Sequence, residues 1–136
     1  MDNKNYNYEL KGDTLIRKII KVNGTEENVI YEKIECFGKG GFGICYKYKN
    51  NQTGEVIIVK ELEKKEISFS EVGIHNNLKN QNIVKLIDTF GYNCKFYLLL
   101  ECCENRDLSS LLKKRKKLKE VEVQYYIIKL IEALKY

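Results

Sequence analysis

The sequence predicts an α+β fold in which strands, one short helix, two further strands and then two helices follow one another. Three observations support this order. Residues 14–22 and 28–37 are rich in β-branched and aromatic side chains, apolar residues recur with a helical period over 67–78, and 108–134 carries two amphipathic helical patterns. Since strands and helices do not alternate regularly, a parallel array of strand–helix–strand units is not expected.

The first half of the chain is predicted to be mostly strand. Residues 1–13 are polar and are expected to form a loose tail, and Asn23-Gly24 indicates a hairpin turn between the first two strands. Glycines within 38–43 lead to another strand at 44–49. After a polar turn, residues 55–62 have an apolar centre and are predicted to form a buried strand.

A short helix is expected after the buried strand, because four residues recur at the spacing of one helical face. These residues are Ile67, Glu71, Ile74 and Leu78. Strands are then predicted at 83–90 and 95–101, with a turn at 91–93 between them. Two helices should complete the chain, and Asp107 is placed to cap the first of them.

Composition restricts the class of function. A net charge of +5 over 136 residues suits nucleotides or phosphopeptides, and nucleic acid is not an expected partner. Five cysteines without a C-x-x-C pair, and a single histidine, predict reduced thiols and no metal site. No stretch approaches the roughly 18 apolar residues of a membrane span, and no apolar leader is present, so cytoplasm or nucleus is the expected location.

A G-x-G-x-x-G motif over 38–43 lies between two predicted strands. Dinucleotide-binding and Walker loops instead require a helix directly after the glycines. Without a Cβ atom, glycine lets backbone N–H groups approach phosphate oxygens closely. Taken alone, the motif fits an ordinary glycine-rich hairpin turn at least as well as a phosphate loop.

Two charged residues occupy positions that are predicted to be buried. Lys60 ends the apolar strand, where its ammonium group must either reach solvent or meet an anion. Glu71 lies on the helical face expected to turn toward the sheet, and a buried carboxylate needs a partner. A pair with Lys60 is favoured because of the upstream glycines, and a capping box with Ser68 is the alternative.

A glycine motif between strands, a strand lysine and a helix glutamate together resemble the small lobe of a protein kinase. The resemblance extends from about Tyr31 to Tyr136. Residues 37–46, with a cysteine shortly after the glycines, are similar to the polo-like serine/threonine kinases, as are residues 71–75 and 116–126.

The resemblance implies an antiparallel five-stranded sheet with one helix, followed by a hinge and the first helices of a large lobe. The small lobe with an extra N-terminal hairpin would occupy residues 14–101, and the hinge and incomplete large lobe would occupy 102–136. The basic run at 113–119 is interpreted as a solvated helix end, with a nuclear-localisation or nucleic-acid patch as the alternative.

The resemblance also implies ATP as cofactor and a protein as substrate or partner. Lys60 would hold the α- and β-phosphates, and Glu71 would orient Lys60. Ile58 would cover the adenine, and Leu100 would set the depth of its pocket. The remaining nucleotide contacts would come from Gly38, Lys39, Gly40, Gly41, Phe42, Gly43, Cys45, Glu101 and Cys103.

The sequence departs from the family pattern in three ways. Ile58 stands where a small alanine is usual, and Glu71 follows Lys60 by only eleven residues. The chain also contains no His-Arg-Asp and no Asp-Phe-Gly, which in the family supply the catalytic base and magnesium ligands. These residues alone are therefore not expected to transfer phosphate, although a complete kinase would use Mg²⁺.

Two other interpretations stay open. One is a degenerate or truncated kinase, a pseudokinase, that binds nucleotide or a partner protein without catalysis. The other is a basic interaction protein that shares only the shape of the lobe. The last helix reaches Tyr136 without a cap, which favours a fragment of a longer protein whose large lobe would be required for activity.

Overall fold

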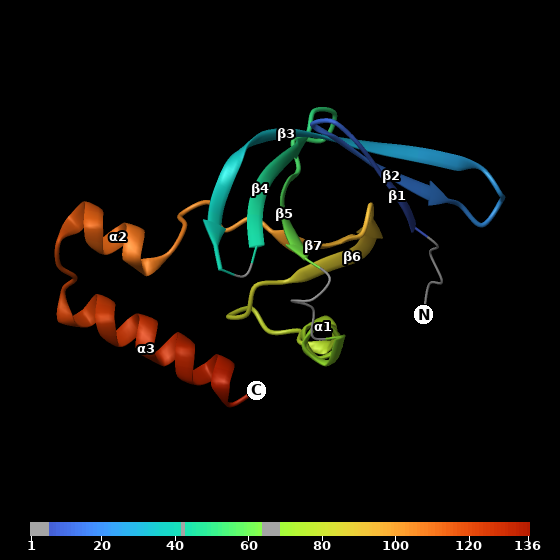
Figure 1. The fold of residues 1–136 in the computed structure, drawn as a ribbon. Coiled ribbons are helices and arrows are strands. Elements are labelled where there is room, and N and C mark those ends of the chain that lie inside the picture. Colours follow the sequence, from blue (N-terminus) through green and yellow to red (C-terminus); the bar gives the residue numbers. More distant parts are fainter. Residues whose placement is uncertain (1–5, 42, 64–68) are drawn as a thin grey trace. The chain divides into compact units, whose positions relative to one another are not determined.

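The computed structural model describes residues 6–41, 43–63 and 69–136, without the side chains of Tyr6 and residues 69–71. The chain divides into two compact units. The first comprises Met1–Asn76 with Leu86–Cys102, and the second comprises Asn77–Lys85 with Cys103–Tyr136. Figure 1 shows the ribbon of the chain, coloured from the N-terminus to the C-terminus.

The first unit contains a seven-stranded sheet with the order β1-β2-β3-β4-β5-β7-β6, in which every neighbouring pair is antiparallel. The α+β fold predicted from the sequence is confirmed, and the five expected strands are β3, β4, β5, β7 and β6. The strand bounds are β1 Tyr6–Lys11, β2 Thr14–Ile20, β3 Glu26–Gly40, β4 Gly43–Asn50, β5 Val56–Glu63, β6 Leu86–Tyr92 and β7 Lys95–Glu101.

Strand β1 corrects the expectation of a loose tail for residues 6–11, while residues 1–5 of the expected tail at 1–13 lie outside the described residues. It pairs with β2 along its whole length, and the Tyr8 side chain reaches β6 at the far edge of the sheet. The Tyr8 ring stacks on Phe90 with 4.4 Å between centroids, and its hydroxyl donates to Asp88 Oδ2 at 2.5 Å. A partner 80 residues away in sequence therefore secures this strand, which a local pattern could not indicate.

The core lies on one face of this curved sheet, where β1 at one edge contacts β6 at the other (Figure 1). Alternate residues of the strands supply it, as expected for a strand with one buried face. A fully buried Leu or Val side chain stabilises the fold by about 1.5–3 kcal/mol. The buried residues of the core are Leu15, Tyr31, Tyr48, Ile57, Val59, Phe90, Tyr97 and Leu99.

The boundaries of β6 and of the turn that follows it differ from the sequence prediction. Strand β6 runs from Leu86 to Tyr92, so the predicted strand at 83–90 begins three residues and ends two residues too early. The turn to β7 is made by Asn93 and Cys94, which both have positive φ, of 47° and 63°. Asparagine tolerates this backbone conformation better than most residues. Because the turn is made at residue 93, strand β6 continues past Gly91 to Tyr92.

Helix α1 (Phe69–Asn77) is turned differently from the sequence prediction. Ile74, expected to face the sheet, is 61% exposed. Val72 and His75 are the half-covered side chains, and residues three apart share one helical face. Since Ile74 is about 200° around the helix from Val72, the two cannot be covered together. Ile67 and Ser68 lie outside the described residues.

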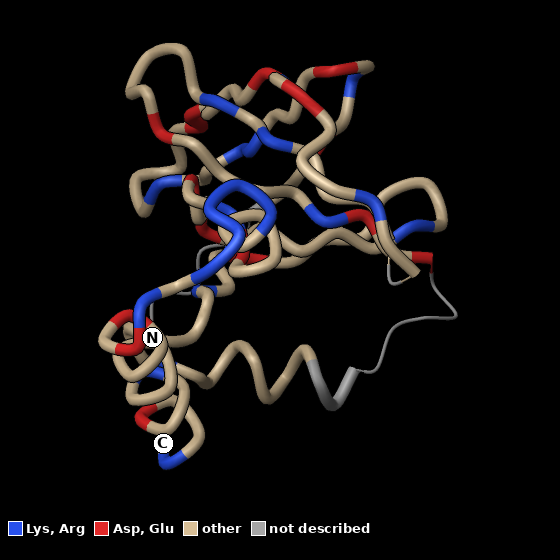
Figure 2. The backbone as a smooth tube through the Cα atoms, turned by 90° about the vertical axis from the view of Figure 1, so that its left-hand side faces the viewer, with Lys and Arg blue, Asp and Glu red and all other residues tan. Residues whose placement is uncertain are grey.

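The second unit contains α2 (Leu108–Arg115) and α3 (Glu120–Leu134). The predicted cap is confirmed, because Asp107 Oδ1 accepts a hydrogen bond from the Ser110 backbone N–H at 2.6 Å. The lysines and arginine of the basic run at the end of α2, part of the chain drawn blue in Figure 2, are exposed, and Arg115 Nη1 lies 2.5 Å from Glu122 Oε1. Within the described ranges, no helix combines the length and apolar character needed to cross a membrane.

Candidate functional site

The glycine motif joins two strands, as the sequence predicts. Strands β3 and β4 are antiparallel, and Gly40 and Gly43 form their last pair before the turn. A Cβ atom on Gly38, Gly40 or Gly41 would meet no other atom within 4 Å. The backbone is therefore open to a ligand at three of the four glycines, while Phe42 lies outside the described residues.

Gly43 has a different role from the other glycines. Its φ is +116°, and an added Cβ atom would lie 2.1 Å from the backbone oxygen of Glu61. Side chains rarely adopt this backbone conformation, and the neighbouring strand leaves no space for one. Gly43 is thus required for the close approach of β4 to β5, whether or not a phosphate binds nearby.

Four of the predicted site residues, all on strands, share one face of the sheet, opposite the core. Cys45 on β4 lies directly opposite Lys60 on β5, and Ile58 lies directly opposite Leu100 on β7. Directly opposed residues point to the same side, as do residues two apart in one strand. The face also contains Leu98, which is opposite Lys60 and which the sequence reasoning missed.

The register could have indicated Leu98. It lies two residues before Leu100 on an expected strand and therefore shares its face. The intervening residue, Leu99, is 1% exposed and belongs to the core on the other side. We name the surface formed by Cys45, Ile58, Lys60, Leu98 and Leu100 the lysine face.

The electrostatics of Cys45 reflect its position beside Lys60. Burial raises the pKa of the Cys45 thiol, and the positive charge of Lys60 opposes that rise. The ammonium group therefore acts on the same small region of the sheet as the thiol. An anion placed over Cys45 would experience the same positive charge.

The space available for a flat ring is limited by Ile58. This side chain is only 5% exposed, whereas Leu100 opposite it is partly exposed. A branched side chain at this position takes up room that a smaller residue would leave. The predicted effect of Ile58 on an adenine pocket is consistent with this burial and is open to direct measurement.

The opposite side of the glycine turn is unsuited to phosphate. A small cavity of about 170 Å³ there is lined by the glycines, Ile44, Glu61 and Glu63. Two carboxylates would repel a phosphate group. The lysine face is consequently the side of the sheet on which the turn could hold an anion.

The remaining predicted residues are only partly located. Lys39 and Glu101 are exposed at the ends of β3 and β7, and Cys103 is exposed in the second unit. Glu71 belongs to α1, but its side chain lies outside the described residues. Its pairing with Lys60 therefore stays a prediction.

The described carboxylates do not fit a magnesium site. Asp13 pairs with Lys33, Asp88 accepts from Tyr8, and Asp107 caps α2. Across the described segments, no group of three or more His, Cys, Asp or Glu side chains is arranged to hold a metal ion. The glycine backbone and Lys60, in contrast, fit the phosphate part of a nucleotide.

Comparisons with known proteins agree with this geometry. The family described as protein kinase domain matches residues 31–136. The chain is 39% identical over 132 residues to the probable serine/threonine-protein kinase CCRP1 of Zea mays, covering 90% of this chain and 21% of that protein.

Two relatives bear polo or cell-cycle names. The serine/threonine-protein kinase polo of Drosophila melanogaster is 33% identical over 136 residues, covering 94% of this chain and 23% of that protein. The cell cycle serine/threonine-protein kinase CDC5/MSD2 of Saccharomyces cerevisiae is 35% identical over 126 residues, covering 87% and 17%. The chain thus spans about a fifth of the length of these curated relatives.

Proposed function

Because the chain belongs to the protein kinase domain family, we propose that it is the nucleotide-binding lobe of a polo-like serine/threonine kinase. The whole protein would transfer the γ-phosphoryl group of ATP to a serine or threonine hydroxyl of a protein substrate. The observation that carries the proposal is the position of Lys60. It lies on β5 directly opposite Cys45, which is on β4, the strand that follows the glycine turn.

Lys60 would bind the α- and β-phosphates through its ammonium group. Its place is fixed by the backbone pairing of β5 with β4 on one side and β7 on the other. A charge held by a sheet does not have to be reorganised when an anion arrives, which makes its interaction with that anion more favourable. ATP, when bound, supplies the phosphoryl group that is transferred.

The glycine turn would contribute backbone N–H groups to the phosphates. The positions where Cβ atoms of Gly40 and Gly41 would lie are open, so phosphate oxygens could approach the backbone there. Cys45 and Leu98 would provide apolar contact for the adenine on the lysine face, and Glu71 would orient Lys60.

A nucleotide-binding or protein-binding module without catalysis is the second candidate function. The burial of Ile58 opposite Leu100 favours it, since this bulk reduces the room for adenine. The structural roles of Asp13, Asp88 and Asp107 favour it as well, since these carboxylates are already engaged. For the 136-residue chain itself, we expect nucleotide binding without phosphoryl transfer.

The test is a fluorescence titration of the chain with an ATP analogue that carries a fluorophore on its ribose. Lys60→Met should raise the Kd at least about 10-fold, because a hydrogen bond to a charged group contributes about 1.5–3 kcal/mol. Lys49→Met is the matched control, because Lys49 is an exposed lysine on neighbouring β4. It should leave the Kd unchanged.

Two further measurements complete the experiment. Glu71→Gln should weaken binding less than Lys60→Met, since Glu71 would act only through Lys60. Transfer of labelled phosphate from ATP to casein should be at background for the chain. Equal losses from Lys60→Met and Lys49→Met would refute a specific nucleotide site, and turnover would refute the non-catalytic assignment of this chain.

A further inference from the structure

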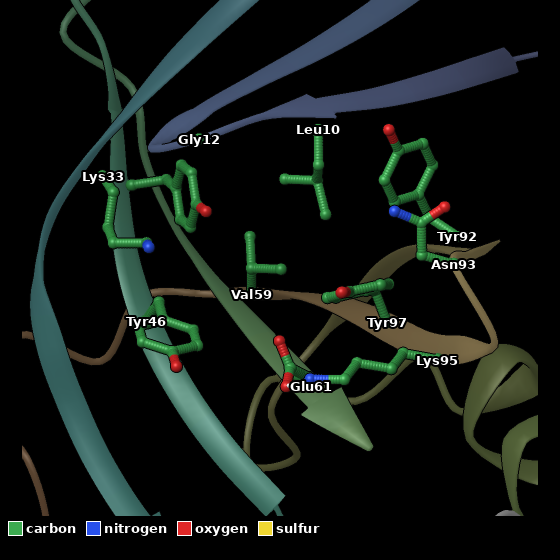
Figure 3. A pocket seen from close by; sticks show the side chains of 11 residues that line it. Leu10, Gly12, Lys33, Tyr46, Val59, Glu61, Tyr92, Asn93, Lys95 and Tyr97 are labelled. Carbon is green, nitrogen blue, oxygen red and sulfur yellow. Dashed lines mark hydrogen bonds and ion pairs between the residues drawn. The ribbon is translucent and has the colours of Figure 1, made fainter. Parts of the chain in front are cut away.

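A second cavity lies on the core side of the sheet, on the face opposite Lys60. Its volume is about 330 Å³, and strands β1, β3, β4, β5, β6 and β7 contribute to its lining (Figure 3). Val59 and Glu61, the neighbours of Lys60 in β5, both line it. Since successive residues of a strand point to opposite faces, the sheet separates this cavity from the lysine face.

The walls of the cavity are largely aromatic. Tyr46, Tyr48, Tyr92 and Tyr97 line it, with Val59 as an apolar contact between them. Tyrosine rings favour stacked or edge-to-face contact with another ring. Burial raises the pKa of Tyr48 to about 12 and also raises the pKa of Tyr97. Both phenols therefore keep their protons at neutral pH and remain hydrogen-bond donors.

The lining carries an excess of one positive charge. Lys95 is paired with Glu61 inside the cavity, so their charges offset each other. Lys33 Nζ lies 4.7 Å from the centroid of the Tyr46 ring, and Figure 3 shows the lysine reaching toward the cavity. Its carboxylate partner Asp13, at 2.6 Å, is not part of the lining.

A bound ligand could break the ion pair of Lys33 with Asp13 at little energetic cost. The Asp13 side chain is 74% exposed, whereas that of Lys33 is only 27% exposed. Water and salt screen an exposed pair of this kind, so it contributes little to stability. An anion inside the cavity could therefore share the Lys33 ammonium group with Asp13, or replace Asp13 as its partner, without a large loss of folding stability.

We propose that this cavity is a second binding site, specific for a single aromatic ring that bears a carboxylate. The ring would lie among the tyrosines, and the carboxylate would accept hydrogen bonds from Lys33. The volume is at the lower end of ligand pockets, which span about 300–1,000 Å³, and it suits a ligand with one ring. The site is independent of nucleotide binding on the lysine face.

The test compares three probes of nearly equal shape by NMR titration of the chain: 3-phenylpropionate, 3-phenylpropanamide and 3-phenylpropylamine. Saturable shifts at Tyr46, Val59 and Tyr97 are expected with the carboxylate. The neutral amide should bind at least about 10-fold more weakly, because it lacks the charge that Lys33 recognises. Equal binding of acid and amide, or preference for the amine through Glu61, would overturn the proposal.

Two lysine variants distinguish binding in the cavity from nonspecific attraction of the probe to the positively charged surface. Lys33→Gln should raise the Kd of 3-phenylpropionate about 10-fold, while Lys49→Gln, on the exposed side of the same hairpin, should leave it unchanged. Tyr46→Leu, which keeps an apolar side chain but removes the ring, should also weaken binding. Unchanged binding by Lys33→Gln would overturn the proposal and would leave the nucleotide assignment untouched.

Discussion

Cys45 and Lys60 lie directly opposite each other on β4 and β5, and the charge of the lysine opposes the effect of burial on the thiol. The pair marks the face of the sheet on which a phosphate would meet positive charge. The core-facing side of the same two strands instead presents Tyr46 and Val59 to the second cavity. One pair of strands thus separates two chemically different surfaces.

The first prediction concerns the reactivity of Cys45. Lys60→Met removes the charge that lowers the pKa of this thiol, so the pKa should rise further and the thiolate fraction at pH 8 should fall. Alkylation of Cys45 by iodoacetamide, followed by site-resolved mass spectrometry, should slow several-fold. Lys49→Met should not change the rate, and a faster reaction in Lys60→Met would contradict the arrangement.

The second prediction concerns Gly43. Gly43→Ala should lower the free energy of unfolding by about 3 kcal/mol or more, since it adds backbone strain to a clash with Glu61. Gly41→Ala is the control, because a Cβ atom there meets nothing within 4 Å. Urea denaturation of both variants measures the difference. Similar losses would show that β4 and β5 are not as close at Gly43 as described.

The third prediction concerns alkaline pH. Burial raises the pKa of Tyr31 to about 12, with a further rise from Glu55, which accepts its hydroxyl hydrogen bond at 2.7 Å. The ordinary value is about 10, so the stabilisation is complete below pH 10 and is lost as pH rises through 12. By pH 11 the loss from this tyrosine should be about 1 kcal/mol.

Tyr31→Phe tests this linkage. The variant should be less stable than the parent at pH 8, because it loses a partly buried hydrogen bond worth about 1 kcal/mol. Its free energy of unfolding should fall less between pH 8 and pH 11, since one titrating phenol is gone. Parallel pH profiles for the two proteins would show that the Tyr31 pKa is not raised in the folded state.

The fourth prediction concerns Ile58. Ile58→Ala should tighten the binding of an ATP analogue by enlarging the adenine space, at a cost of about 2–4 kcal/mol in stability. Ile57→Ala serves as the matched variant, because Ile57 is 2% exposed on the opposite face. It should lose similar stability without gaining affinity. Equal affinities of the two variants for the ATP analogue would show that Ile58 does not limit the nucleotide site.

The parts of the fold set by local pattern could be predicted from the sequence. The glycines between two strands, Lys60 on an apolar strand and Asp107 as a helix cap all follow from neighbours within a few residues, although β5 continues to Glu63. Each depends on backbone geometry or alternation, which short segments encode. The position of Cys45 opposite Lys60 was not among the sequence predictions and comes from the strand register of the structure.

The parts set by distant contacts could not be predicted in this way. Strand β1 depends on the contact of Tyr8 with Phe90, and the residues that line the second cavity come from six strands. The rotation of α1 differs as well, because its short apolar pattern fits more than one face and Val72 is covered in place of Ile74. In each case the local sequence pattern is compatible with several arrangements, and tertiary packing determines which one forms.

The most direct test of the central claim is a methyl-resolved NMR titration of the chain with ADP. If the nucleotide binds on the lysine face, methyl signals of Ile58, Leu98 and Leu100 should shift together and saturate. Signals of Val59 and Leu99, which alternate with them on the core face, should stay in place. Shifts confined to Val59 and Leu99, or no saturable shift at all, would contradict nucleotide binding at Lys60.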